Sequence, residues 1–330
     1  MRVELKSAAF RAEREASWRE LEGLVGRVEK GGVRALSAGE LARLPVLYRA
    51  TLSSLSVARA ISLDRNVLDW LESLCGRAYL AVYGTRRHLR EALGDFFARR
   101  FPRAVRAHAW HLALSWSLLL LGVLAGWALT RADPERFYAF VDARYAQGRG
   151  PTSSTESLRQ VLYTERKAAE MLQTFSAFLF SNNARIGLMA FALGFAAGAP
   201  TALLLFSNGL VLGAFGALYA SRGLGLEFWA WVLPHGVTEL TAVALCGAAG
   251  LALGQALLFP GQEERLAALA RRGREAGVVA LGAVFLFFLA ALVEGLFRQL
   301  VHEVPVRWAV AAGSALVLST WLVTAGRERR

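Results

Sequence analysis

Residues 186–220 read IGLMAFALGFAAGAPTALLLFSNGLVLGAFGALYA and contain no charged side chain. Apolar runs of about 20 residues span a bilayer core of roughly 30 Å as α-helices. The polar pair Ser207-Asn208 divides this run into a stretch over 186–206 and a shorter one over 209–220. The shorter stretch is too short to span alone, so we interpret it as a half-helix or as a span that extends to Leu226.

The rest of the composition agrees with a membrane location. Hydrophobic residues make up 55% of the chain and charged residues 19%, which excludes a disordered chain. Only two cysteines are present, which excludes a disulfide scaffold. Further apolar stretches cover residues 108–129, 229–259, 277–297 and 308–325. We therefore expect an all-α polytopic membrane protein with about six transmembrane helices in a domain over residues 106–330.

Arginine clusters predict the orientation. The formal net charge is +12, and three clusters flank the apolar stretches. Six crossings place all three on one side, which the positive-inside rule assigns to the cytoplasm. They are Arg99, Arg100, Arg103 and Arg106; Arg265, Arg271, Arg272 and Arg274; and Arg327, Arg329 and Arg330. The expected location is the cell inner (cytoplasmic) membrane, with several spans, contact with the lipid bilayer and both termini cytoplasmic.

Residues 1–105 predict a cytoplasmic helical domain. One helical face carries Trp18 to Val28, and Ser37 with Glu40 fits a capping box at the start of another helix. The N-terminal arginines alternate with glutamates as on a solvated helix face, so no nucleic-acid partner is expected. Residues 86–101 form a basic amphipathic helix that either lies along the lipid headgroups or packs on the bundle.

A helical external segment is expected over residues 130–183. Asp133-Pro134 is typical of a helix start. Ser153 and Glu156 fit a second capping box, and a long amphipathic helix is predicted to run from there towards Asn182-Asn183.

Four polar residues in the apolar stretches form a candidate intramembrane cluster. His235 and Glu239 are four residues apart and share a helix face, Glu294 lies in the following span, and Asn208 lies at the predicted break. We favour a buried hydrogen-bond cluster, because unsatisfied polar groups are costly in lipid. An ion or proton path and a metal site, which requires three or four ligands, are the alternatives.

Motifs for catalysis are missing from the sequence. It contains no Walker-type phosphate loop and no G-x-S-x-G nucleophile motif. We therefore expect no enzymatic activity, no catalytic residue, no resident metal and no cofactor.

Glycines are dense between residues 187 and 216. Gly194 with Gly198 and Gly209 with Gly213 each form a G-x-x-x-G pair. Small residues at this spacing let helix backbones approach closely, either within one chain or across a homodimer interface.

Several short motifs, in this order, resemble the stage II sporulation protein M family. They are FSNNARIG over residues 180–187 with Asn183, a glycine-rich span with Pro200, NGLVLG over residues 208–213, Pro234-His235-Gly236 with Glu239, and Val293-Glu294-Gly295. LPVLYR over residues 44–49 and YLAVYG over residues 79–84 resemble the cytoplasmic extension of longer members.

The resemblance implies a membrane scaffold rather than a hydrolase. It implies a role beside enzymes that degrade septal peptidoglycan in spore formers. For longer members it implies a MoxR-type AAA+ ATPase and other membrane or cell-wall proteins as partners. The N-terminal bundle and the sixth span set this chain apart from the shorter sporulation members. An alternative is a transporter or channel subunit with an intramembrane polar path.

Overall fold

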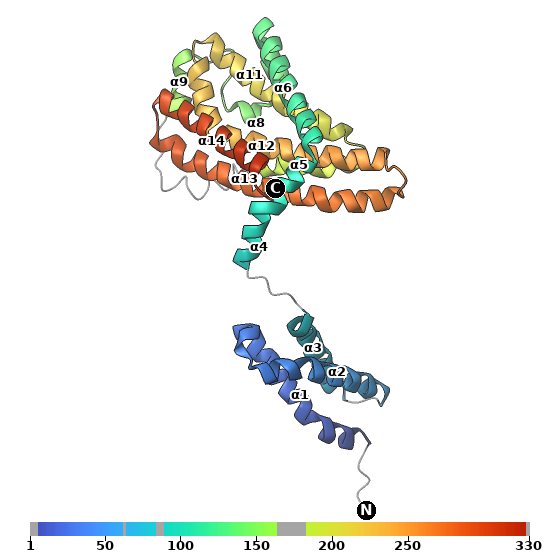
Figure 1. The fold of residues 1–330 in the computed structure, drawn as a ribbon. Helices are drawn as coiled ribbons and strands as arrows, with labels where there is room; N and C mark the ends of the chain where they lie inside the picture. The colour runs from blue at the N-terminus through green and yellow to red at the C-terminus, as the bar shows by residue number, and fades with distance from the viewer. Residues whose placement is uncertain (1–5, 62–63, 84–88, 164–182, 328–330) are drawn as a thin grey trace, which may run out of the picture. The chain divides into compact units, whose positions relative to one another are not determined.

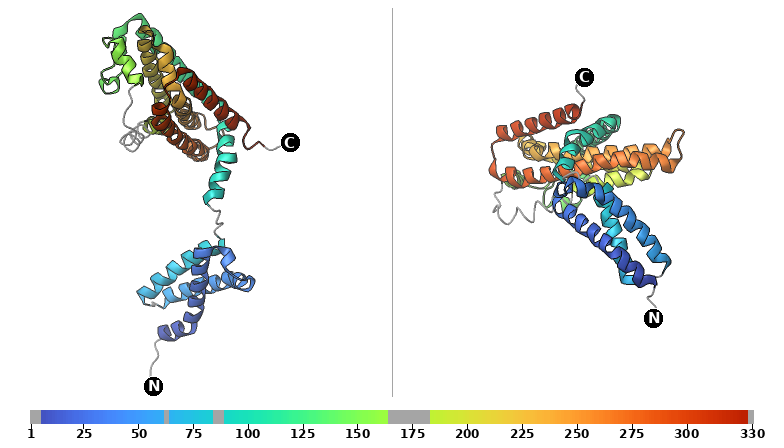
Figure 2. Two further views of the ribbon diagram at one scale, coloured as in Figure 1. Left: turned by 90° about the vertical axis from the view of Figure 1, so that its left-hand side faces the viewer. Right: turned by 60° about the horizontal axis from the view of Figure 1, so that its bottom comes forward.

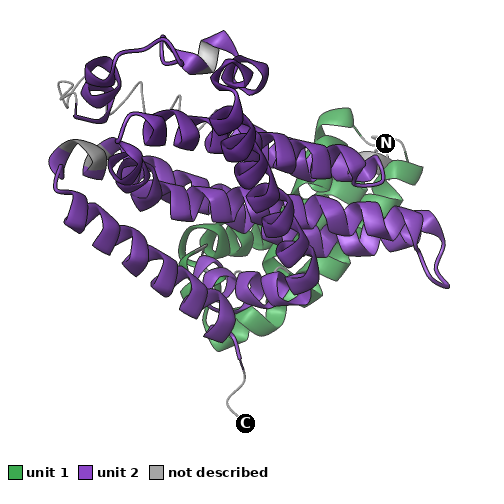
Figure 3. Ribbon diagram, turned by 90° about the horizontal axis from the view of Figure 1, so that it is seen from above, with its two compact units in different colours: residues 1–92 green, residues 93–330 purple. Residues whose placement is uncertain are grey.

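The computed structural model describes residues 6–61, 64–83, 89–163 and 183–327, and all regular structure in these ranges is helical (Figure 1). The expected all-α class is therefore confirmed. The chain divides into two compact units, residues 1–92 and residues 93–330 (Figure 3). Each unit is described by itself.

The first unit is a bundle of three helices with its own apolar core. The elements are α1 (Lys6–Gly31), η1 (Val33–Ala35), α2 (Ala38–Ala60) and α3 (Arg65–Tyr83). The predicted face from Trp18 to Val28 is buried in this core. The predicted capping box is present, because the Ser37 side chain accepts from the Glu40 backbone and the Ser37 N–H donates to the Glu40 carboxylate at 2.9 Å.

The second unit contains five helices that are long and apolar enough to cross a membrane, gathered into one bundle (Figure 2). They are α6 (Ala109–Ala132), α11 (Ala199–Ser221), α12 (Gly225–Leu258), α13 (Arg265–Leu300) and α14 (Val304–Thr324). A sixth apolar helix, Asn183–Phe195, is about 20 Å long at 1.5 Å per residue, which is shorter than the bilayer core. The described chain thus has five long candidate spans and one short helix where about six spans were expected.

The predicted break at Ser207-Asn208 is wrong, because both residues lie inside the continuous helix α11. The chain breaks earlier, after the turn η4 (Leu193–Phe195), where Ala197 and Gly198 adopt positive φ angles of 60° and 76°. Pro200 follows in the first turn of α11, where its missing N–H leaves no helical hydrogen bond unmade. Residues 209–220 are therefore the second half of a full-length helix that ends at Ser221.

Contacts between helices define their directions. Gly209 abuts Gly122 and Gly213 abuts Trp127, so α6 and α11 run parallel. The short helix Asn183–Phe195 runs the other way, alongside α12, because Gly187 meets Cys246 and Gly194 meets Gly250. The short helix therefore supplies part of the return between α6 and α11.

The two ends of the second unit lie on one side of the bundle. Residues 93–107 comprise the end of α4 (Leu89–Asp95), η2 (Phe96–Arg100) and α5 (Phe101–Ala107). Phe101 is fully buried and packs on Trp321 of α14 with ring centroids 5.5 Å apart, and Arg106 donates to the Leu322 carbonyl at 2.7 Å. The compact second unit therefore begins at Leu93, and the buried Phe96 and Phe101 belong to its core.

The segment after α6 is helical, with caps that differ in part from the prediction. Its elements are η3 (Pro134–Arg136), α7 (Phe137–Phe140), α8 (Ala143–Ala146) and α9 (Thr155–Tyr163). Asp133 caps the first of them as predicted. The cap of α9 is Ser154, whose Oγ accepts from the Ser157 N–H at 3.1 Å, whereas Ser153 donates to the Gly148 carbonyl. The predicted continuation of α9 over residues 164–182 lies outside the described residues.

Candidate functional site

The candidate site begins on α12, a long apolar helix that carries the ionisable residues His235 and Glu239 in its interior. Pro234 lies inside this helix and cannot donate to the carbonyl of Ala230, so the backbone ladder is interrupted there. His235 follows directly, and Glu239 lies one turn further on the same face. A Cβ on Gly236, which lies between them, would meet only the Val232 side chain of the preceding turn, at 3.1 Å.

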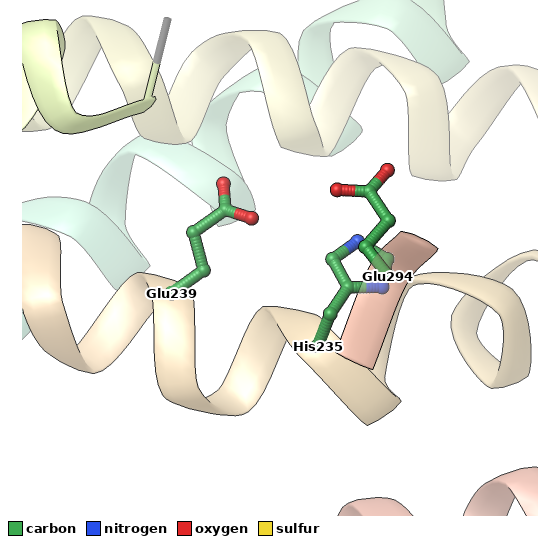
Figure 4. A group of neighbouring side chains, drawn as sticks. All are labelled: His235, Glu239 and Glu294. Atoms are coloured by element: carbon green, nitrogen blue, oxygen red, sulfur yellow. The ribbon is translucent and has the colours of Figure 1, made fainter. Parts of the chain in front are cut away.

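The antiparallel helix α13 adds the third member of the group. The ligand-type atoms of His235, Glu239 and Glu294 all lie within 4.8 Å of one another (Figure 4). His235 is 7% exposed and Glu294 6% exposed, whereas Glu239 is half-buried. The structure thus brings together three of the four residues predicted for the polar cluster, and we call them the HEE cluster.

Asn183 joins the HEE cluster from the short helix, because its side chain hydrogen-bonds Glu239. Sequence reasoning identified Asn183 only as part of a motif and not as a partner of the carboxylates. Asn208, the fourth predicted member, lies half-buried in the interior of α11 beside the helix-packing residue Gly209. Three separate segments of the chain therefore meet at the HEE cluster.

Glycines hold the surrounding helices close together. A Cβ on Gly209 would lie 2.9 Å from the Cα of Gly122. A Cβ on Gly213 would lie 2.8 Å from the backbone nitrogen of Trp127. A Cβ on Gly194 would lie 2.5 Å from the Cα of Gly250 in α12, and one on Gly198 would lie 3.7 Å from the Cα of Gly254, at ordinary contact distance. Both predicted G-x-x-x-G pairs therefore pack within the chain.

The HEE cluster has the chemistry to bind protons or a cation. Two ionised carboxylates this close repel each other strongly in a low-dielectric medium. The repulsion is offset when a carboxyl holds a proton, when the imidazole is protonated, or when a cation is bound. An imidazole nitrogen and carboxylate oxygens are also ligands that divalent metals accept.

Comparison with known families yields two matches. The family described as Stage II sporulation protein M matches residues 115–297, which is more than half of the chain and includes the HEE cluster. A domain of unknown function (DUF8413) matches residues 8–84, within the first unit. No curated protein and no solved structure matches the chain.

Proposed function

Because the chain belongs to the stage II sporulation protein M family, we propose that it is a non-enzymatic membrane scaffold of an envelope-associated complex. In this role the first unit binds a cytoplasmic protein and the second unit anchors the complex in the inner membrane. The residues between α6 and the short helix face envelope partners on the other side.

The observation that carries this proposal is an apolar surface on the first unit. Tyr79, Leu80 and Tyr83 of α3 are 53%, 64% and 58% exposed. The two tyrosine rings are 5.2 Å apart and both lie near Tyr48 of α2. Clustered exposed aromatic residues are typical of protein-binding sites, where tyrosine is enriched among the residues that dominate affinity. We call these three residues the tyrosine surface.

The packing of the second unit supports a static anchor. Where glycines let backbones touch, neighbouring helices interlock along several turns and resist sliding. Both G-x-x-x-G pairs contact other helices of the same chain, so a homodimer would have to form through another surface. The positive-inside rule favours a cytoplasmic side for the tyrosine surface. The partner that we propose there is a MoxR-type AAA+ ATPase, which the family resemblance implies.

Affinity purification in mild detergent tests the proposal. We expect an AAA+ ATPase or a cell-wall protein to co-elute with the wild type and to be lost from a Tyr79→Ser, Tyr83→Ser double variant. Val57→Ser, which changes another exposed apolar residue of the same unit, serves as the matched control and should retain the partner. The proposal fails if the double variant retains the partner, or if the purified protein alone moves ions across liposomes, as a transporter would.

A further inference from the structure

We propose that His235, Glu239 and Glu294 form a binding site for a first-row divalent cation, with Zn²⁺ as the best match. The proposal concerns a ligand site inside the second unit and is separate from the tyrosine surface. It starts from three ligand-type side chains on two helices whose donor atoms converge within 4.8 Å.

The distances are suited to a cation after a small adjustment. Bonds from zinc to histidine nitrogen and carboxylate oxygen are about 2.0–2.2 Å long, so ligand atoms around a tetrahedral ion lie about 3.4 Å apart. Rotation of the Glu294 carboxylate about its side-chain bonds can close part of the remaining gap. The backbones of α12 and α13 already hold the three ligand-type atoms within 4.8 Å of one another, and Figure 4 shows Glu294 beside His235 with Glu239 to one side.

Charge balance also favours a cation. The HEE cluster lies between helices that are apolar enough to cross a membrane, where charges without compensation are expensive. A divalent cation neutralises both carboxylates and removes their mutual repulsion in one step. The neutral imidazole of His235 then serves as the third ligand. Imidazole nitrogen and carboxylate oxygen are both ligands that zinc accepts, and three protein ligands leave one coordination position open.

The surroundings of the HEE cluster resemble the outer shell of a metal site. Asn183 hydrogen-bonds Glu239 and so fixes the orientation of one carboxylate. Trp231, one turn before His235, places its ring at 83° to the imidazole with centroids 6.4 Å apart. The cation would therefore link α12 to α13 and, through Asn183, to the short helix.

Metal titration of the full chain in detergent tests the site. The protein is stripped with a chelator, dialysed against Zn²⁺ and analysed for metal content, and Co²⁺ is added to a second sample to report coordination by visible absorption. We expect about one tightly held ion per chain and a Tm that rises with Zn²⁺, because a ligand bound only by the folded state stabilises it. Glu294→Gln and Glu239→Gln keep the side-chain shape but should weaken binding at least tenfold and abolish the Co²⁺ spectrum.

Glu227→Gln is the matched control. Glu227 lies in the first turn of the same helix and accepts a hydrogen bond from Tyr163, away from the HEE cluster. This variant should bind Zn²⁺ as the wild type does. The proposal is overturned if the wild type retains no ion and its Tm does not respond to Zn²⁺. In that case bound protons would have to neutralise the two carboxylates. The proposal is also overturned if Glu294→Gln binds Zn²⁺ as tightly as Glu227→Gln. Neither result would affect binding of a partner to the tyrosine surface.

Discussion

Replacing Gly213 by alanine should separate α6 from α11 and destabilise the second unit. The new Cβ would lie 2.8 Å from the backbone nitrogen of Trp127 and closer still to the carbonyl oxygen of Val123. Ordinary van der Waals contact begins near 3.4 Å, and both neighbours are backbone atoms that cannot rotate away. The two helices must therefore move apart by more than half an ångström.

The size of the effect follows from three contributions, of which two destabilise the protein and one stabilises it. Overpacking of this kind costs about 1–3 kcal/mol, with the rigid backbone neighbours placing it towards the upper end. A gap of about 0.5–1 Å also removes a quarter to a half of the dispersion energy along the interface. Alanine in a helix gains about 1 kcal/mol over glycine, so we expect a net loss of roughly 1–2 kcal/mol.

Thermal unfolding in detergent measures this loss, and Gly313→Ala is the matched control. Gly313 is also a helical glycine, in α14, and a Cβ there would meet no atom within 4 Å. Gly313→Ala should therefore leave the Tm unchanged or raise it, while Gly213→Ala lowers it by several degrees. Equal effects of the two substitutions would refute the reasoning that backbone contact at Gly213 holds the helices together.

Two further predictions concern a cap and a turn. Hydrogen bonds from Arg27 and Ser37 lower the pKa of Glu40 to about 2 from 4.5, so its stabilisation of α2 is complete above pH 4.5 and is lost as the pH falls towards 2. Protection of the amides at the start of α2, measured against the intrinsic exchange rate at each pH, should fall over that window in the wild type. A Glu40→Gln variant with the same loss of protection would contradict this assignment. Ala197 has a φ of 60° and Gly198 a φ of 76°, a conformation that costs a non-glycine residue roughly 1–2 kcal/mol. Ala197→Gly should therefore raise the Tm slightly, and Gly198→Ala should lower it. A higher Tm for Gly198→Ala would show that the turn before α11 is not strained.

The HEE cluster was predictable from the sequence only in part. The spacing of His235 and Glu239 places them on one face of any helix that contains both. The proximity of Glu294 depends on the register between α12 and α13, which no local pattern encodes. Asn183 reaches the cluster because the short helix runs alongside α12, and its direction depends on contacts such as those between Gly194 and Gly250.

The break in the first long apolar run shows a second limit of sequence reasoning. Ser207-Asn208 is the most polar point of that run, yet one polar pair leaves the backbone hydrogen bonds of α11 intact. Gly198 and Pro200 end one helix and begin the next because of backbone geometry rather than polarity. Hydropathy therefore located the membrane segments but misplaced the break inside one of them.

The sequence by itself determined that the chain is helical and suited to lipid. Its apolar runs exceed what a soluble protein can bury, and a chain in lipid must satisfy its backbone hydrogen bonds within each helix. Only the tertiary structure decided which helices touch, where the chain turns and which polar side chains meet. Those contacts depend on the relative register and direction of helices far apart in the sequence, and packing of whole faces against one another sets both.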